Sequence, residues 1–545
     1  MINGNTLLSN IENKIRKPQV KDILLLATVF VLLSVPAVCI GFFESVQDKL
    51  ISLGGTVRGH ELDAVYWHYL LSVYFKSLFQ FAVCFVAVVC LLHFYLPSAE
   101  KTKVRLLWIF FALSLLLSFI TVVFHEQWYD EVHAFYLAQS MGLRSLFTEM
   151  GVEGHFLPWF FILWPFAKLN FPVQTISYIS WIINAVTLLL FAKKAPFNPF
   201  VKIIVLCTSP FLFWNPVVSR PYVLLALVLF LIAAVYKERN THPYLFAFLV
   251  GILANTHAYI EGLVGILFLY FLIEDTIFPW KNYSRKEKQD HVLALALIVF
   301  LVLVAFVQVL PALFGASWAT SNGVIKFNLS QIFGLVHASE IYGVLAPLFV
   351  ICLVFAFIWC FKHDKKSFVI WFLSCLWMWL FAVFIYNADT TNRALLWFVV
   401  MLFVFWISEK LDKKVVSFFV VVLALFILNP GRNVRDITGV FASTRQAADY
   451  IKENYPAGTD VYEAGWDFHL SYFLPEYTVH PEQCGDWSGF QSGIIVVENC
   501  DANGERIQSL FPENFVMVHD SFIGQNKLPL RKNEVPLRIY EIMTE

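Results

Sequence analysis

Long apolar runs separated by short polar loops fill the first 429 residues, and this pattern constrains the fold more than any other feature. Most runs are near the roughly 17–25 residues that a helix needs to cross a bilayer, and several are shorter. The runs are continuously apolar rather than alternating, so transmembrane β-strands are excluded. We predict thirteen spans, at 22–42, 67–96, 105–124, 174–192, 199–217, 221–236, 244–257, 258–273, 292–314, 341–361, 368–386, 394–408 and 415–429.

The composition agrees with a polytopic membrane protein. Charged residues make up 14% of the chain and hydrophobic residues 59%, whereas a soluble domain has about 25% charged residues. One soluble core could not bury this much apolar surface, so a soluble enzyme is excluded. The formal net charge of -1 also argues against a nucleic-acid-binding protein, which would present a basic face.

The composition changes near residue 430. Residues 430–545 contain 9 basic and 17 acidic side chains, a charged fraction typical of soluble domains. A helix is predicted at Thr444–Asn454, where Ala447, Ala448 and Ile451 are apolar, and strands at Val461–Tyr462 and Ile494–Val497. We therefore predict an all-α polytopic membrane protein with a small extracytoplasmic α/β C-terminal domain.

Three regions follow from these boundaries. Residues 1–104 form an N-terminal cytoplasmic segment and two extra transmembrane helices, residues 105–429 form the transmembrane core with an outer loop at 125–155, and residues 430–545 form the soluble domain. The segment Phe156–Leu169 is short and contains Pro158 and Pro165, so we interpret it as a re-entrant or partial helix.

Lysine and arginine in short loops mark the cytoplasmic side of a membrane protein. With the N-terminus inside and one crossing between 125 and 192, every basic loop cluster falls on that side. Thirteen crossings then place residues 430–545 outside, and the first apolar run is expected to be a retained signal anchor. We predict a bacterial inner membrane with a periplasmic or extracellular C-terminal domain, although an endoplasmic reticulum protein would have a similar sequence. On that side Cys484 and Cys500 are either bridged or free.

Ionisable residues gather at the predicted outer ends of the spans, where they are costly and therefore candidates for function. Alternative interpretations are a solvated acidic loop around Asp130, an interhelical hydrogen bond between His257 and Glu261, and an exposed loop near Arg393. His257 and Glu261 share a helix face if the helix continues between them. The first outer loop adds His60, Glu61 and Asp63, an accessory surface. The candidates are Asp130, Glu131, His133, Glu153, His155, Arg220, Tyr222, His257, Tyr259, Glu261 and Arg393.

Transfer of a glycosyl or phosphoryl group from a lipid-linked donor needs two groups. One is a carboxylate that accepts a proton, and the other is a cation that faces the leaving phosphate. The sequence has no GxxxxGK[ST] loop, no GxGxxG after a strand and no Asp-x-Asp pair, so a soluble nucleotide donor is not expected. Asp130, Glu131 and Glu153 are oxygen ligands, which makes a divalent cation conceivable as a cofactor. No spacing decides this, and we predict no metal site.

Three short motifs carry a family resemblance. They are Tyr129-Asp130-Glu131 after a span, Gly154-His155-Phe156-Leu157-Pro158-Trp159 at the start of a helix, and Ser219-Arg220-Pro221-Tyr222. With them, roughly residues 105–430 and the C-terminal region resemble the GT-C superfamily of integral-membrane glycosyltransferases. The chain is most similar to the branch that holds the protein O-mannosyltransferases and the lipid A aminoarabinose transferase. It departs from that pattern in having Phe156 and Leu157 between His155 and the first proline.

The resemblance implies inverting transfer of a sugar from a polyprenyl-phosphate carrier to an acceptor hydroxyl at the outer membrane face. Asp130 is then the general base, Glu131 positions the acceptor or Asp130, His155 lines the donor cleft and Arg220 pairs with the lipid phosphate. The expected partners are the membrane, a lipid-linked sugar donor and a glycan, lipid or protein acceptor. Two alternatives stay open: a transporter or lipid flippase, and a ligase or polymerase of surface polysaccharide.

Overall fold

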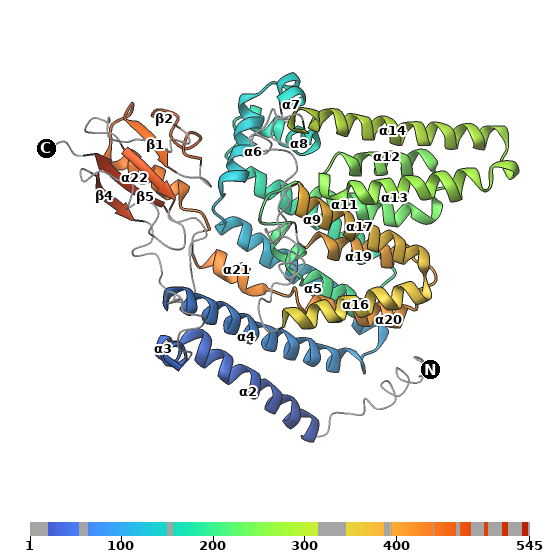
Figure 1. Ribbon diagram of the computed structural model, residues 1–545, viewed down its shortest axis with the longest axis horizontal. Helices are drawn as coiled ribbons and strands as arrows, with labels where there is room; N and C mark the ends of the chain where they lie inside the picture. Colours follow the sequence, from blue (N-terminus) through green and yellow to red (C-terminus); the bar gives the residue numbers. More distant parts are fainter. Residues whose placement is uncertain are drawn as a thin grey trace.

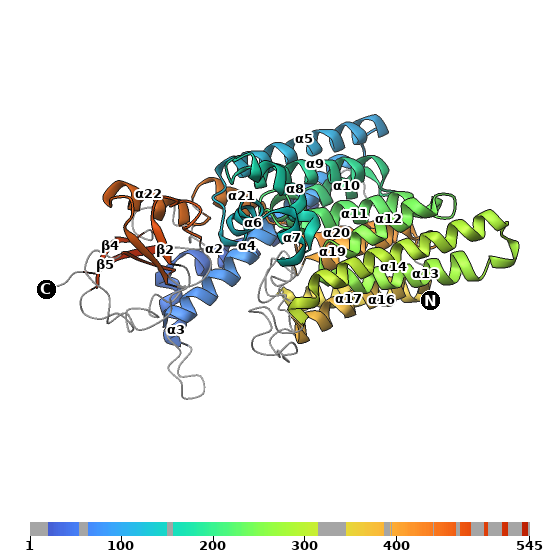
Figure 2. The ribbon, with the colours of Figure 1, turned by 90° about the horizontal axis from the view of Figure 1, so that it is seen from above.

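The computed structural model describes residues 20–53, 64–149, 156–313, 345–385, 393, 395–439, 441–464, 469–480, 495–499, 515–520 and 537–542. These residues are mostly helical, with a small sheet near the C-terminal end. Helices run side by side in one bundle, and the sheet lies at one end of it (Figures 1 and 2). The helices are α2 (Val20–Phe42), α3 (Glu44–Leu53), α4 (Ala64–Tyr95), α5 (Glu100–Phe124), α6 (Tyr129–Ser140), α7 (Leu143–Glu149), α8 (Leu157–Lys168), α9 (Thr175–Lys194), α10 (Pro199–Leu206), α11 (Tyr222–Val235), α12 (Pro243–Ala254), α13 (Glu261–Leu272), α14 (Arg285–Leu313), α16 (Ala346–His363), α17 (Lys365–Phe384), α19 (Leu396–Ile407), α20 (Lys413–Leu425), α21 (Pro430–Ile437) and α22 (Thr444–Asn454).

Several helices have the length and composition of membrane spans. Among the described residues six qualify, and the bent pair Phe30–Phe42 and Glu44–Leu50 would make a seventh. The chain is therefore an integral membrane protein by this criterion. Each of the thirteen predicted segments overlaps a helix, but several of these helices are too short to qualify. The number of crossings stays a prediction.

The degree to which each helix is buried agrees with the distribution of apolar residues in its sequence. Every residue of α19 is buried, as expected for a helix that is apolar on all sides and lies in the centre of a bundle. The outer helices α14 and α16 instead expose large apolar side chains, among them Phe300 and Phe355, each 60% exposed. Such surfaces suit contact with lipid.

Loops rich in lysine and arginine meet at one end of the bundle. Arg239 makes a two-point ion pair with Asp275 at 2.7 and 2.9 Å, Lys366 pairs with Glu274, and Lys237 lies 3.0 Å from Glu409. The Asp364 carboxylate also accepts hydrogen bonds from the Ser367 and Ser408 hydroxyls. We call this the basic end of the bundle; the connection between α13 and α14 lies there, opposite the sheet (Figure 1).

The sheet contains five strands in the order β2-β1-β3-β5-β4. β1 pairs in parallel with β2 and β3, whereas β5 is antiparallel to β3 and β4. α22 begins and ends at the predicted residues, and its Ala447, Ala448 and Ile451 are buried. The two predicted strands are confirmed as β1 and β3, and sequence reasoning missed the other three. The strands are β1 (Asp460–Ala464), β2 (Thr478–His480), β3 (Ile495–Asn499), β4 (Phe515–Asp520) and β5 (Leu537–Ile542).

One apolar cluster joins the sheet to the helical bundle. Val122 of α5 and Val217 pack in the same cluster as Phe441, Leu470 and Ile539. The sheet and α22 therefore pack against the end of the bundle at which α5 ends and α6 begins (Figure 2).

The predicted outer loop at 125–155 and the segment after it contain three helices, α6, α7 and α8. Phe135 and Phe147 lie on different helices, because the chain breaks after Ser140 into α6 and α7. Phe135 is fully buried in a cluster shared with α8, so this face of α6 packs inside the protein. The segment predicted as a re-entrant or partial helix forms the 12-residue helix α8, with Pro158 in its first turn and Pro165 inside it.

Candidate functional site

An ion pair joins two of the predicted site residues across the start of α6. Asp130 lies in the first turn of α6, and its carboxylate pairs with the guanidinium of Arg220, which precedes α11. The Asp130 side chain is 29% exposed and that of Arg220 only 9%. The guanidinium also lies over the ring of Trp128, 5.9 Å from its centroid. A reachable carboxylate and a nearly buried cation are therefore in direct contact.

Arg220 retains capacity for a second anion. A guanidinium has five N–H donors in a fixed fork, and the ion pair with Asp130 involves Nη1. Its Nε is buried and has no hydrogen-bond partner among the described residues. An unpaired buried donor is costly, so an anion that reached this nitrogen would relieve that cost.

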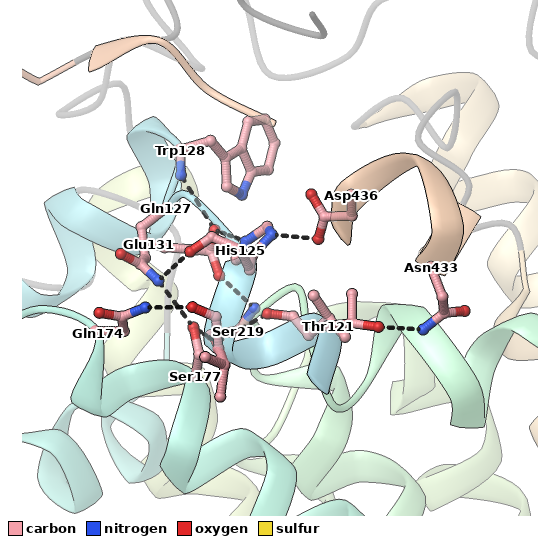
Figure 3. Close-up of polar contacts among 12 residues, drawn as sticks. Thr121, His125, Gln127, Trp128, Glu131, Gln174, Ser177, Ser219, Asn433 and Asp436 are labelled. Atoms are coloured by element: carbon pink, nitrogen blue, oxygen red, sulfur yellow. Dashed lines mark hydrogen bonds and ion pairs between the residues drawn. The ribbon is translucent and has the colours of Figure 1, made fainter. Parts of the chain in front are cut away.

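Glu131, the next residue, has a different environment (Figure 3). Its carboxylate is fully buried and accepts hydrogen bonds from the backbone N–H of Ser219 at 2.7 Å and of Trp128 at 3.1 Å. The same carboxylate lies 3.0 Å from Nε2 of His125. Direct contact between Glu131 and an acceptor, one of the two expected roles, does not fit a side chain with no exposed surface. The other role, positioning Asp130, does fit.

His125 lies between two carboxylates (Figure 3). Its Nδ1 is 2.8 Å from Asp436 of α21, and its Nε2 faces Glu131. Burial alone would lower the pKa of His125, but the charges of Asp436 and Glu131 and their hydrogen bonds outweigh it and raise the pKa well above 6.5. The imidazole is therefore a protonated cation shared by two buried anions.

Further hydrogen bonds fix the surrounding backbone. Asn433 of α21 donates to the Thr121 hydroxyl at 2.9 Å and to the Leu212 carbonyl at 3.0 Å. The Ser219 hydroxyl donates to the Ser177 hydroxyl at 3.1 Å. These bonds connect α5, α9, α21 and the segment before α11 (Figure 3). That segment carries Arg220, and α5 ends just before α6, which carries Asp130.

A second group of predicted residues meets on the other side of the start of α11. Arg393 Nε donates to the Tyr222 hydroxyl at 3.0 Å, and the Tyr222 ring lies 4.8 Å from that of His257. His257 Nδ1 accepts a hydrogen bond from the Tyr259 backbone at 3.2 Å. Tyr222 is two residues from Arg220, so the two groups flank one short segment.

The helix does not continue from His257 to Glu261. α12 ends at Ala254, and His257 has an extended backbone with φ of -165°. The shared helix face expected for His257 and Glu261 is therefore wrong. Glu261 begins α13, and its Oε1 is buried without a hydrogen-bond partner among the described residues.

His133 belongs to a third group, which connects α6 to the C-terminal region. Its ring stacks on that of Tyr129 at 5.2 Å and lies 5.6 Å from the ring of His469. Tyr136 contacts His469 from the next turn of α6, at 4.9 Å. Burial and the neighbouring His133 lower the pKa of His469 to about 4.

Some candidates lie outside the described residues, namely Glu153 and His155, with His60, Glu61 and Asp63 of the first outer loop and the pair Cys484 and Cys500. Within the described part of the chain, no group of three His, Cys, Asp or Glu side chains is placed to hold a metal ion.

Sequence reasoning gave no role to Asp436 or to His125. Asp436 is 311 residues from His125, so no local pattern connects them. In the sequence, Asp436 stands out only as an acidic residue directly after Arg435 in a short polar segment. His125 was visible only as the first polar residue after a long apolar run.

No protein-family model matches the sequence, and no curated protein matches it either.

Proposed function

We propose that this protein is a glycosyltransferase of the GT-C type, which transfers a sugar from a polyprenyl-phosphate-linked donor to an acceptor hydroxyl with inversion. The observation that carries the proposal is the contact between Asp130 and Arg220. It provides a proton acceptor and an anion-binding cation side by side, at the end of a bundle of apolar helices. A lipid carrier in the bilayer can present a phosphate to that position.

Asp130 is the general base of the proposed reaction. The acceptor oxygen attacks the anomeric carbon as its proton passes to the Asp130 carboxylate. The bond between that carbon and the phosphate oxygen breaks on the opposite face, and the phosphate leaves with the electron pair. Arg220 holds the phosphate through donors that do not face Asp130, and it stabilises the negative charge that develops there.

The buried residues hold this pair in place. Glu131 fixes the start of α6 and the Ser219 backbone at once, and these two segments carry Asp130 and Arg220. Tyr222 and Arg393 line the other side of the same segment. We assign both groups to the donor and acceptor site, with His257 and Tyr259 beside them.

The proposal includes a membrane arrangement. Thirteen crossings place the basic end of the bundle in the cytoplasm, and Asp130, Arg220 and the α/β domain of residues 430–545 on the outer face of a bacterial inner membrane. Loops rich in lysine and arginine at one end and the candidate site at the other support this orientation. The acceptor is a glycan, lipid or protein that reaches the outer face.

Transfer by the purified protein in lipid vesicles tests the proposal. The protein is offered a panel of radiolabelled polyprenyl-phosphate sugars, alongside Asp130→Asn and the matched control Asp449→Asn, an exposed residue of α22 at the same end of the molecule. We expect the wild type and the control to release label from the carrier and Asp130→Asn to fail.

Other outcomes favour other assignments. Transfer by Asp130→Asn at the wild-type rate would retain the enzyme and remove Asp130 as its base. Transfer of long glycans in place of single sugars would identify a ligase or polymerase. If no variant released label with any donor or acceptor, and the vesicles translocated the lipid-linked sugar, the protein would be a flippase.

A further inference from the structure

A cavity of about 660 Å³ opens at the basic end of the bundle, at the opposite end of α9 from the candidate site. It lies between the last turns of α9, α11 and α19 and the first turn of α20. α9 has 20 residues, about 30 Å at 1.5 Å per residue, so the cavity is remote from Ser177 and its neighbours. Its size is within the 300–1,000 Å³ typical of ligand pockets.

The charges around the cavity favour an anion. Four lysines line it, and Glu409 is the one carboxylate among its lining residues. Within the described part of the chain, Lys194 and Lys413 have no carboxylate partner, whereas Lys237 pairs with Glu409 at 3.0 Å. Both members of that pair are 67% exposed, so the pair is weak and can open. The four lysines are Lys194, Lys237, Lys413 and Lys414.

The backbone at this end is already satisfied. Asp412 caps α20 by accepting hydrogen bonds from the N–H groups of Lys414 and Val415 at 2.9 and 3.0 Å. Asn198 likewise caps α10, and its amide donates to the Ser417 hydroxyl at 3.1 Å. These caps use side chains other than the lysines, which leaves the ammonium groups of Lys194 and Lys413 to bind a ligand.

The apolar surroundings indicate a lipid. Phe405, Trp406 and Val416 line the cavity beside the lysines. Phe418, next to the lining residue Ser417, is 55% exposed, and Leu189 of α9 is 36% exposed. Phe405, Trp406 and Val416 are already buried, but Phe418 is not. A soluble phosphate would leave Phe418 exposed, whereas the acyl chains of a phospholipid would cover it. Basic pockets between membrane helices on the cytoplasmic side bind anionic headgroups in this way.

We infer that this cavity binds the phosphate headgroup of an anionic glycerophospholipid, with Lys194 and Lys413 as its principal contacts. The acyl chains lie along α20 over Phe418. The inference does not depend on the proposed glycosyl transfer, because it rests on residues at the other end of the bundle.

Native mass spectrometry of the purified protein, titrated with dioleoylphosphatidylglycerol or dioleoylphosphatidylcholine, tests the inference. Each lysine near an anionic lipid contributes on the order of 1 kcal/mol, so Lys194→Gln with Lys413→Gln is expected to weaken phosphatidylglycerol binding roughly 30-fold. The matched control Lys281→Gln with Lys286→Gln removes the same charge from exposed positions at the same end. It is expected to bind as the wild type does, and phosphatidylcholine is expected to bind weakly to all three proteins.

Three results would overturn the inference. Equal loss of binding in the cavity double variant and the control would mean that the lipid senses only the overall charge of that end. Competition by millimolar glycerol 1-phosphate would assign the cavity to a soluble phosphate compound. Full binding by the cavity double variant, with its melting temperature in detergent unchanged, would place the lipid elsewhere.

Discussion

Asp130 and Glu131 are adjacent carboxylates in the first turn of α6, yet their amide variants should fail in different ways. Glu131→Gln replaces one carboxylate oxygen with an NH₂ group. The remaining oxygen can still accept from the Ser219 N–H, but the NH₂ then faces the Trp128 N–H and the protonated His125, so donors meet donors. Breaking a buried ion pair in this way costs about 3–5 kcal/mol.

Asp130→Asn makes the same chemical change one residue earlier. Arg220 is nearly buried, but the Asp130 carboxylate is 29% exposed, and the amide oxygen of the variant can still accept a hydrogen bond from the guanidinium. The expected loss is therefore on the order of 1 kcal/mol. At about 2.1 cal/mol/K of unfolding entropy per residue over 545 residues, we therefore expect Glu131→Gln to melt on the order of 3–4 °C lower. Asp130→Asn should keep a nearly native melting temperature. Sugar transfer should show the opposite order for folded protein below the melting temperature, because Asp130→Asn removes the proton acceptor.

Tryptophan fluorescence during heating in detergent measures the first quantity, and label transfer at 20–25 °C, well below unfolding, measures the second. The wild type and Asp449→Asn are the references. If Glu131→Gln were as stable as the wild type, the buried ion network would not hold the start of α6. If Asp130→Asn were the less stable of the two, the ion pair with Arg220 would be structural.

Three further predictions follow from the same region. The raised pKa of His125 contributes stability that is complete below about pH 6.5 and is lost as the pH rises through the pKa of the folded protein. The melting temperature should therefore fall at alkaline pH, and it should fall less in His125→Gln. The lowered pKa of His469 acts in the other direction. The stability that it contributes is complete above pH 6.5 and is lost as the pH falls toward 4, by up to about 3 kcal/mol. In His469→Phe the melting temperature should therefore depend less on pH between 6.5 and 4. Arg220→Lys keeps the charge but loses the planar fork, and we expect transfer to fall roughly 10- to 100-fold; transfer at the wild-type rate would show that the phosphate is held elsewhere.

Sequence patterns predicted the parts of this protein that depend on local periodicity. Continuous apolar runs located the helices, and the spacing of Ala447, Ala448 and Ile451 located α22 to the residue. β4 and β5 were missed although residues 515–518 are an apolar run and Leu537 and Ile539 alternate with a polar residue. Both patterns cover only a few residues within a long polar stretch. A boundary was predicted between the spans 244–257 and 258–273, but the apolar pattern did not show that six residues, 255–260, lie between α12 and α13.

The candidate site was predictable as a set of residues but not as an arrangement. Asp130 and Arg220 were both singled out by the cost of placing charge near a bilayer, and they prove to be in contact. The different environments of the adjacent carboxylates Asp130 and Glu131 were not predictable. They depend on which face of α6 meets the Ser219 backbone. That contact joins segments 88 residues apart, and no spacing within either segment specifies it.

Asp436 connects the C-terminal region to the candidate site through buried side chains, in addition to the ring contacts that His469 makes with α6. It belongs to α21, which leads from the last membrane helix to α22 and the sheet, and it holds His125 from the side opposite Glu131. His125 in turn fixes the carboxylate that positions the start of α6. A displacement of α21 would leave a buried cation with one anion in place of two, which is costly in a low dielectric. We therefore expect the geometry of Asp130 and Arg220 to depend on the position of α21, through the buried side chains of Asp436, His125 and Glu131.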